Sequence, residues 1–225
     1  MRRFVLASLA TVVASLALLM PMGDKEGASA SHVDPILFVH GYTSNAATWN
    51  TVISRFVADG WESNRLYAYT FSSTQSNATI AQAVAQRVSE IRAATGAAKV
   101  DIISHSMGGL SSRYYLKTLG GTAYVDEWVS IAGPNHGTSW AYGCFFTSPC
   151  NQMIPGSSFL NQLNSGDETP GSVRYGTWWS PCDELINPDT STILSGATNT
   201  QSSCLSHSGI KDSATTYAQV RDFVR

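Results

Sequence analysis

The chain has few charged residues, no internal repeat and no low-complexity segment, and each absence excludes a class of protein. Charged residues make up 13% of the 225 positions, which is not the composition of a disordered acidic or basic tail. A heptad pattern is also missing, so a coiled coil is excluded. With 43% hydrophobic residues, the chain can instead bury the core of a globular domain.

A long apolar run occurs at the N-terminus and nowhere else in the sequence. Two arginines at positions 2–3 precede an uncharged apolar segment, residues 4–20, and Ala28-Ser29-Ala30 follows it. This order of basic, apolar and A-x-A parts predicts a secretory signal peptide, residues 1–30, that is cleaved after Ala30. An uncleaved membrane anchor is the alternative, since the run approaches the ~18 residues of a spanning helix. The A-x-A site favours cleavage.

The predicted mature chain, residues 31–225, is expected to form a single secreted, extracellular domain. Cleavage removes three basic and two acidic residues, leaving 11 and 14, a formal charge of −3. Such a surface offers no basic footprint for nucleic acid. We expect a monomer that binds no nucleic acid and does not insert stably into a membrane.

Four cysteines follow the predicted cleavage site, and an exported compartment favours disulfides. Cys144 and Cys150 bracket a short loop, whereas Cys182 and Cys204 lie in later loops. Three pairings are possible, and this arrangement favours sequential pairing. A zinc site is the alternative, but the spacings match no zinc-ligand pattern and no histidine lies close to the first two cysteines.

Short β-rich runs alternate with helical ones along the mature chain. Strands are predicted at 36–40, 66–69, 99–104, 125–131, 173–178 and 193–197, and helices at 48–58, 79–94, 106–119 and 214–224, with a short helix near 158–163. Thr79 and Gln82 can form a capping box for the clearest helix. The alternation predicts an α/β fold with a mostly parallel sheet of about six strands, helices on both faces, and a ligand site at the carboxyl ends of the strands. The loop-rich stretch 133–172 is too short for a cap domain.

One turn carries more chemical information than any other segment. Ser104-His105-Ser106-Met107-Gly108-Gly109 follows an apolar run and precedes a helical stretch. Strand, tight turn and helix with a serine at the apex are typical of the nucleophile elbow of an α/β-hydrolase, which makes Ser106 the predicted nucleophile. Ser104 stands where the G-x-S-x-G pattern has glycine, although a small side chain is compatible with the crossing. A Gly/Ser-rich turn without chemistry is the alternative.

A serine nucleophile needs a histidine base and a carboxylate, in the order serine, acid, histidine along this fold. Only His136 and His207 follow Ser106. His136 comes directly after a predicted strand and leaves few residues for an intervening acid. His207 lies in a polar loop before the last helix, where the base of such a hydrolase belongs, and is therefore favoured.

The acid is predicted at Asp183, which closely follows the strand predicted at 173–178. Glu184 and Asp189 are the alternatives, and any of the three can be a solvated loop carboxylate. A bond between Cys182 and Cys204 would tie the acid loop to the base loop and limit their relative motion. The other early histidines, His40 and His105, flank turns and are predicted to be structural hydrogen-bonding groups.

Two backbone N–H groups are expected to form an oxyanion hole for the developing negative charge. The residue after the nucleophile, Met107, supplies one donor. The loop after the first strand, His40-Gly41-Tyr42, places Tyr42 as the other.

These segments together resemble the small secreted lipases of actinobacteria, in the lidless lipase class 2 of the α/β-hydrolases. The resemblance covers the mature chain and rests on His40-Gly41-Tyr42, residues 104–109, Gly133-Pro134-Asn135-His136-Gly137-Thr138, residues 178–183 and Cys204-Leu205-Ser206-His207. It implies hydrolysis of acylglycerol esters without a cofactor or metal, and some relatives also cleave synthetic polyesters. Carried over by position, it implies Ser106 as nucleophile, Asp183 as acid, His207 as base, and Tyr42 and Met107 as oxyanion donors.

Aromatic loop residues are candidates for an acyl groove, with ordinary core packing as the alternative. They are Tyr42, Phe145, Phe146, Trp178 and Trp179. A short-chain esterase or polyester hydrolase is the alternative enzyme. A non-catalytic binding module of the same fold is the alternative outside enzymes, and the presence of both nucleophile and base argues against it.

Overall fold

The computed structural model describes Met1 and residues 34–225. The predicted signal peptide, residues 1–30, lies outside the described residues except for Met1. The fold is therefore given for the part of the chain that begins at Asp34.

Six strands form one parallel sheet in the order β2-β1-β3-β4-β5-β6. They are β1 (Ile36–Val39), β2 (Leu66–Ala68), β3 (Val100–His105), β4 (Val125–Ile131), β5 (Arg174–Trp179) and β6 (Thr198–Gln201). The prediction of a mostly parallel sheet of about six strands is confirmed. All six carboxyl ends lie at one edge, so the loops that follow the strands converge there.

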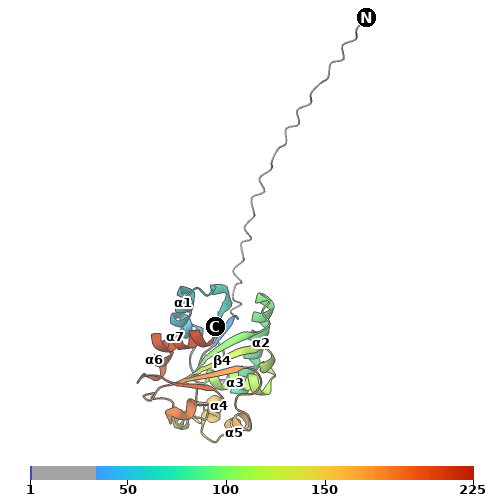
Figure 1. Cartoon of the computed structure of the whole chain (residues 1–225). Coiled ribbons are helices and arrows are strands. Elements are labelled where there is room, and N and C mark those ends of the chain that lie inside the picture. Colours follow the sequence, from blue (N-terminus) through green and yellow to red (C-terminus); the bar gives the residue numbers. More distant parts are fainter. Residues whose placement is uncertain (2–33) are drawn as a thin grey trace. The chain divides into compact units, whose positions relative to one another are not determined.

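Helices cover both faces of the sheet (Figure 1). The α-helices are α1 (Asn50–Ala58), α2 (Asn77–Thr95), α3 (Gly108–Thr118), α4 (Ser148–Met153), α5 (Ser158–Asn164), α6 (His207–Asp212) and α7 (Ala214–Phe223). Apolar side chains of α2 and α3 form the core on one face, and those of α1 and α7 form the core on the other. No helix within residues 34–225 is long and apolar enough to cross a membrane.

The last strand differs from the prediction. The apolar segment 193–197 is a loop, and β6 begins at Thr198. Leu194 is fully buried, and the Asn199 side chain accepts a hydrogen bond from its N–H and donates one to its carbonyl oxygen. The apolar residues therefore indicated a buried loop rather than a strand. The edge strand β6 has mostly exposed side chains and is held by backbone pairing with β5, which the apolar pattern does not reveal.

Helix boundaries also differ where a capping residue competes with the apolar pattern. The predicted start at Thr79 is wrong, because α2 begins at Asn77 and Ser76 caps it by accepting from the Thr79 N–H at 3.1 Å. The short helices α4 and α6 were not predicted, since six residues hold too little periodicity to read.

Asp101 is a buried carboxyl in β3 whose replacement is expected to stabilise the fold. It is 1% exposed, and its Oδ1 accepts the Glu127 N–H at 3.1 Å. Burial, reinforced by the Glu127 side chain, raises the pKa of Asp101 well above 3.8. At a pH above 3.8 the carboxyl is ionised in the unfolded chain but still protonated in the folded chain. The free energy of unfolding therefore falls as pH rises above 3.8.

We therefore expect Asp101→Asn to have a higher Tm than the wild type at pH 7, with the difference shrinking towards pH 4. Differential scanning calorimetry across this range measures it. Asp126→Asn is the control, because that side chain is 44% exposed in a surface pair with Lys99 and should change Tm little. A lower Tm for Asp101→Asn at pH 7 would contradict the expectation.

Candidate active site

Ser106 lies at the apex of a strained turn between β3 and α3. Its φ is 56°, in the left-handed region that costs energy for a residue with a Cβ. A Cβ on Gly108 would lie 2.5 Å from the Val39 carbonyl oxygen, so only glycine lets α3 cross β1 this closely. Ser104 is fully buried and donates from Oγ to the Val129 carbonyl oxygen at 2.6 Å, which explains how serine replaces the usual glycine. The turn thus has the geometry of a nucleophile elbow.

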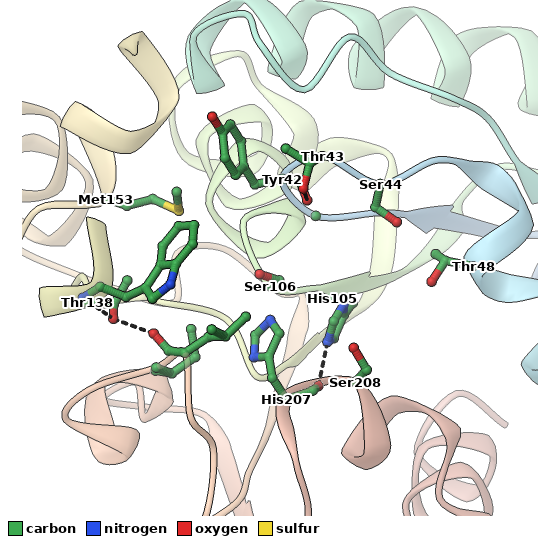
Figure 2. Close-up of a pocket in the computed structure, with 14 residues that line it drawn as sticks. Tyr42, Thr43, Ser44, Thr48, His105, Ser106, Thr138, Met153, His207 and Ser208 are labelled. Carbon is green, nitrogen blue, oxygen red and sulfur yellow. Dashed lines mark hydrogen bonds between the residues drawn. The ribbon is translucent and has the colours of Figure 1, made fainter. Parts of the chain in front are cut away.

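Asp183 and His207 form a buried pair on the loops after β5 and β6. His207 Nδ1 lies 2.9 Å from Asp183 Oδ2 and 3.0 Å from Oδ1, with side-chain exposures of 6% and 2%. Because Nδ1 donates to the carboxylate, Nε2 is the nitrogen left to accept a proton. In Figure 2 the His207 imidazole lies beside Ser106 in the same cleft.

The Asp183 carboxylate is held in its charged form by its partners. Burial by itself would raise its pKa, but the hydrogen bond and charge of His207, together with the N–H groups of Ile186 and Leu185 at 2.9 Å, lower the pKa below 3.8. Neither of the alternative acids pairs with the imidazole. Glu184 accepts from the His207 backbone N–H, and Asp189 accepts from the N–H of Thr190.

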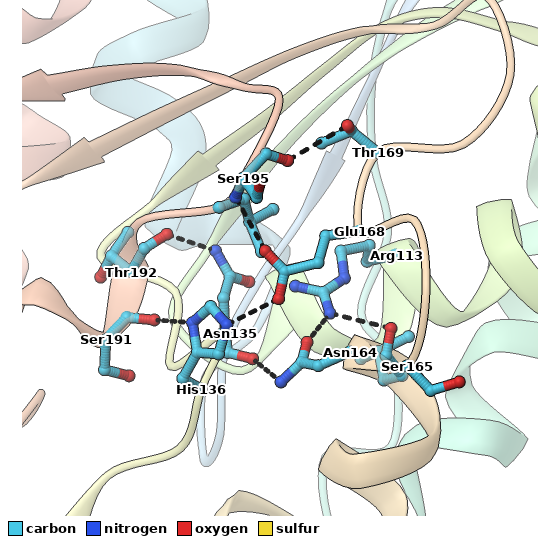
Figure 3. Close-up of polar contacts among 12 residues, drawn as sticks. Arg113, Asn135, His136, Asn164, Ser165, Glu168, Thr169, Ser191, Thr192 and Ser195 are labelled. Carbon is cyan, nitrogen blue, oxygen red and sulfur yellow. Dashed lines mark hydrogen bonds and ion pairs between the residues drawn. The ribbon is translucent and has the colours of Figure 1, made fainter.

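His136 belongs to a separate polar cluster (Figure 3). Its Nε2 pairs with Glu168 Oε1 at 2.7 Å, and its Nδ1 lies 3.3 Å from the Ser191 carbonyl oxygen. Glu168 also accepts from the Ser195 N–H, which joins the chain before β5 to the chain before β6. His136 does not line the cleft that contains Ser106.

The two backbone N–H groups predicted to form an oxyanion hole belong to Tyr42, which lines the cleft, and to Met107, which directly follows Ser106. Within residues 34–225, neither the Tyr42 N–H nor the Met107 N–H donates to a protein acceptor. A Cβ on Gly41 would lie 2.7 Å from the Ser106 Cβ, so glycine is required for this close approach. The loop is fixed by His40, whose Nε2 accepts from the Phe71 N–H at 2.8 Å and whose Nδ1 donates to the Gly41 carbonyl at 2.9 Å. Burial lowers the pKa of His40, so the imidazole stays neutral and can make both bonds.

The cleft around Ser106 has a volume of about 300 Å³ and a mixed lining. This is the lower end of the range for small-molecule sites. Its apolar wall consists of Tyr42, Trp140, Met153, Leu185 and Ile186. Tyr42 was predicted, whereas the other four were missed, because nothing in the sequence shows which loop side chains turn inward.

The remaining predicted groove residues lie elsewhere. Phe145 and Phe146 are 60% and 77% exposed and do not line the cleft. Trp178 is 2% exposed, packs against Phe223 at 5.5 Å between ring centroids, and donates to Gln219. It is therefore a core residue, and Trp179, its neighbour in β5, does not line the cleft either.

Both predicted disulfides are present, Cys144–Cys150 and Cys182–Cys204. The zinc alternative is wrong, because all four thiols are used in these bonds. The second bond places Cys182, adjacent to Asp183, against Cys204 of the loop that leads to His207.

Comparison with known proteins places this geometry in a family. The family model described as lipase (class 2) matches residues 33–221. A phospholipase A(1), LCAT3, of Arabidopsis thaliana is 29% identical over 157 residues, 67% of this chain, and the chain spans about a third of that protein, 34%. The mature form of the lipase BlEst2 of Bacillus licheniformis superposes with a TM-score of 0.75 at 16% identity, covering 85% of this chain and 91% of that one. For lipase B of Aspergillus fumigatus the TM-score is 0.70 at 19% identity, over 85% and 52%. Together with the family model, these structural likenesses establish an α/β-hydrolase fold, and residues 34–225 add no cap domain to it.

Proposed function

This chain belongs to the class 2 lipase family, and on that premise we propose that it is a secreted serine hydrolase of carboxylic esters that acts on acylglycerols. Ser106 Oγ attacks the ester carbonyl carbon while His207 Nε2 takes the hydroxyl proton. The N–H groups of Tyr42 and Met107 hold the carbonyl oxygen as it becomes negative. His207 then gives the proton to the leaving alcohol, and water, activated by the same nitrogen, releases the acid from the acyl-enzyme.

The observation that carries this proposal is the convergence of three loops on one cleft. A strained serine and a histidine paired through Nδ1 with a buried carboxylate meet there, and the N–H groups of Tyr42 and Met107 have no protein acceptor within residues 34–225. A non-catalytic binding module has no need of this combination. A fluorescent phosphonate ester should label Ser106 covalently in the wild type, and tandem mass spectrometry locates the label. A folded protein that resists labelling would contradict the proposal.

The substrate class is proposed from the segment that supplies Trp140 and Met153 to the cleft wall. Residues 133–166 contain no Asp, Glu, Lys or Arg. Trp140, in the cleft wall, is 42% exposed, and Tyr142, Phe145 and Phe146 are 57–77% exposed on the same segment. An uncharged aromatic rim suits a neutral ester aggregate, which favours emulsified acylglycerol over a soluble short-chain ester. The small cleft volume is the observation that favours the esterase or polyester-hydrolase alternative.

We expect Phe145→Ser/Phe146→Ser to lose activity on an emulsified triglyceride while keeping it on a soluble butyrate ester. Burying one phenylalanine is worth about 2 kcal/mol, so the loss of two, about 4 kcal/mol, should weaken adsorption by up to about a thousandfold. Kinetics on both substrates measure the change. Val57→Ser, at a 44% exposed position of α1, is the matched control. Equal losses on both substrates would contradict the role of this rim.

Secretion is proposed from the N-terminal pattern, and the two disulfides are compatible with an extracellular location. N-terminal sequencing of protein recovered from culture medium tests it, with Ser31 expected as the first residue.

A further inference from the structure

The peptide groups on both sides of His207 are held by two side chains, one from the loop after β5 and one from the last residue of β3. Glu184 Oε2 accepts the His207 N–H at 2.9 Å. On the other side, His105 Nε2 donates to the His207 carbonyl oxygen at 2.9 Å (Figure 2). Glu184 directly follows Asp183 in the sequence, and His105 directly precedes Ser106. The Glu184 contact therefore links His207 to the residue next to the proposed acid. The His105 contact links it to the residue next to the proposed nucleophile.

The His207 N–H needs an acceptor from outside its own helix. His207 is the first residue of α6, and the first N–H groups of a helix have no acceptor within it. The capping residue, Ser206, is occupied with the N–H of Gly209 at 3.1 Å. The Glu184 carboxylate fills this role, and a charged acceptor makes a stronger hydrogen bond than a neutral one.

The contact from His105 has a fixed proton arrangement. A carbonyl oxygen can only accept, so His105 Nε2 carries the hydrogen. The two imidazole rings lie 4.7 Å apart between centroids, and His105 is 7% exposed. Burial, followed by the neighbouring His207, lowers the pKa of His105 to about 3. His105 is thus neutral at any pH well above that value, and the donor does not change as pH is varied.

We propose that His105 and Glu184 are positioning residues that set where the His207 imidazole stands between Ser106 and Asp183. This inference rests on the proposed function. Ser180 Oγ and the Cys182–Cys204 bond also join the acid and base segments, but they do so through Leu205 and Cys204. His105 and Glu184 contact His207 itself, so their loss moves the imidazole without opening the loop.

Paired substitutions separate hydrogen bonding from packing. His105→Phe keeps a ring without the donor, and His105→Gln restores an N–H at a similar reach. Glu184→Ala removes the acceptor, and Glu184→Gln restores a neutral one. Asp189→Ala is the control, because within residues 34–225 this carboxylate accepts a hydrogen bond only from the N–H of Thr190. The measurements are kcat and KM on a soluble butyrate ester, the rate of labelling by a phosphonate ester, and Tm.

We expect His105→Phe and Glu184→Ala to lower kcat and the labelling rate by about 10- to 100-fold with KM little changed, as misplacement of a base by about 1 Å does. The glutamine variants should recover most of the loss, and Asp189→Ala should resemble the wild type. Wild-type rates in the first two variants, or glutamine variants as slow as these, would overturn the proposal. If His105→Phe does not fold, the comparison of Glu184→Ala with Glu184→Gln tests the proposal by itself, because Glu184 is an exposed residue. A wild type that is not labelled would instead overturn the proposed function.

Discussion

Replacing Ser106 with alanine is expected to lower kcat on any ester substrate by about five to six orders of magnitude, and His207→Ala should cost about as much. The two side chains act as one unit, because a serine hydroxyl is a poor nucleophile until the base takes its proton. The double variant should therefore be little worse than either single variant. Asp183→Asn should lower kcat by about four orders of magnitude, because the imidazole would keep its position but would no longer be held in the tautomer that carries hydrogen on Nδ1.

Steady-state kinetics with active-site titration measure these losses, and circular dichroism checks that each variant folds. His136→Ala is the decisive comparison, because His136 pairs with Glu168 outside the cleft and should retain most of the activity. An inactive His136→Ala beside an active His207→Ala would overturn the assignment of the base.

The sequence was sufficient to predict that His207 lies in one cleft with Ser106 and contacts Asp183, because two rules act together. In a parallel sheet every strand delivers its loop to the same edge, and the chain order of nucleophile, acid and base is fixed in this fold. The turn at Ser106 could also be predicted from its small residues, because α3 crosses β1 so closely that no larger side chain fits at Gly108.

The direction of the side chains in the loops could not be predicted from the sequence. Trp178 and Phe145 have the same aromatic character in the sequence, yet one is buried in the core and the other is exposed to solvent. Trp140 and Met153, which stand on either side of the Cys144–Cys150 bond in the sequence, both line the cleft. The contacts of Glu184 and His105 with the His207 backbone depend on where α6 begins, and its six residues carry no periodic signal.

Removing the Cys182–Cys204 bond is expected to produce the largest loss of thermal resistance among the disulfide variants. This bond closes a separation of 22 residues, for which chain entropy gives about 3 kcal/mol as an upper value. For a domain of this size each 1 kcal/mol corresponds to roughly 2–4 °C in Tm, so Cys182→Ser/Cys204→Ser should lose up to about 10 °C. Residual activity after heating should fall with it, because the bond joins the segments that carry Asp183 and His207.

The Cys144–Cys150 bond provides the matched comparison within the same chain. It closes a separation of only 6 residues, for which the same argument gives about 2 kcal/mol, and it joins neither the segment that carries Asp183 nor the one that carries His207. Cys144→Ser/Cys150→Ser should therefore lose less Tm and keep its kcat at 25 °C. Peptide mapping of the non-reduced protein establishes the connectivity first. Equal losses in the two double variants, or a peptide joining Cys182 to Cys144 or Cys150, would contradict the view that the longer bond preserves the geometry of the acid and the base.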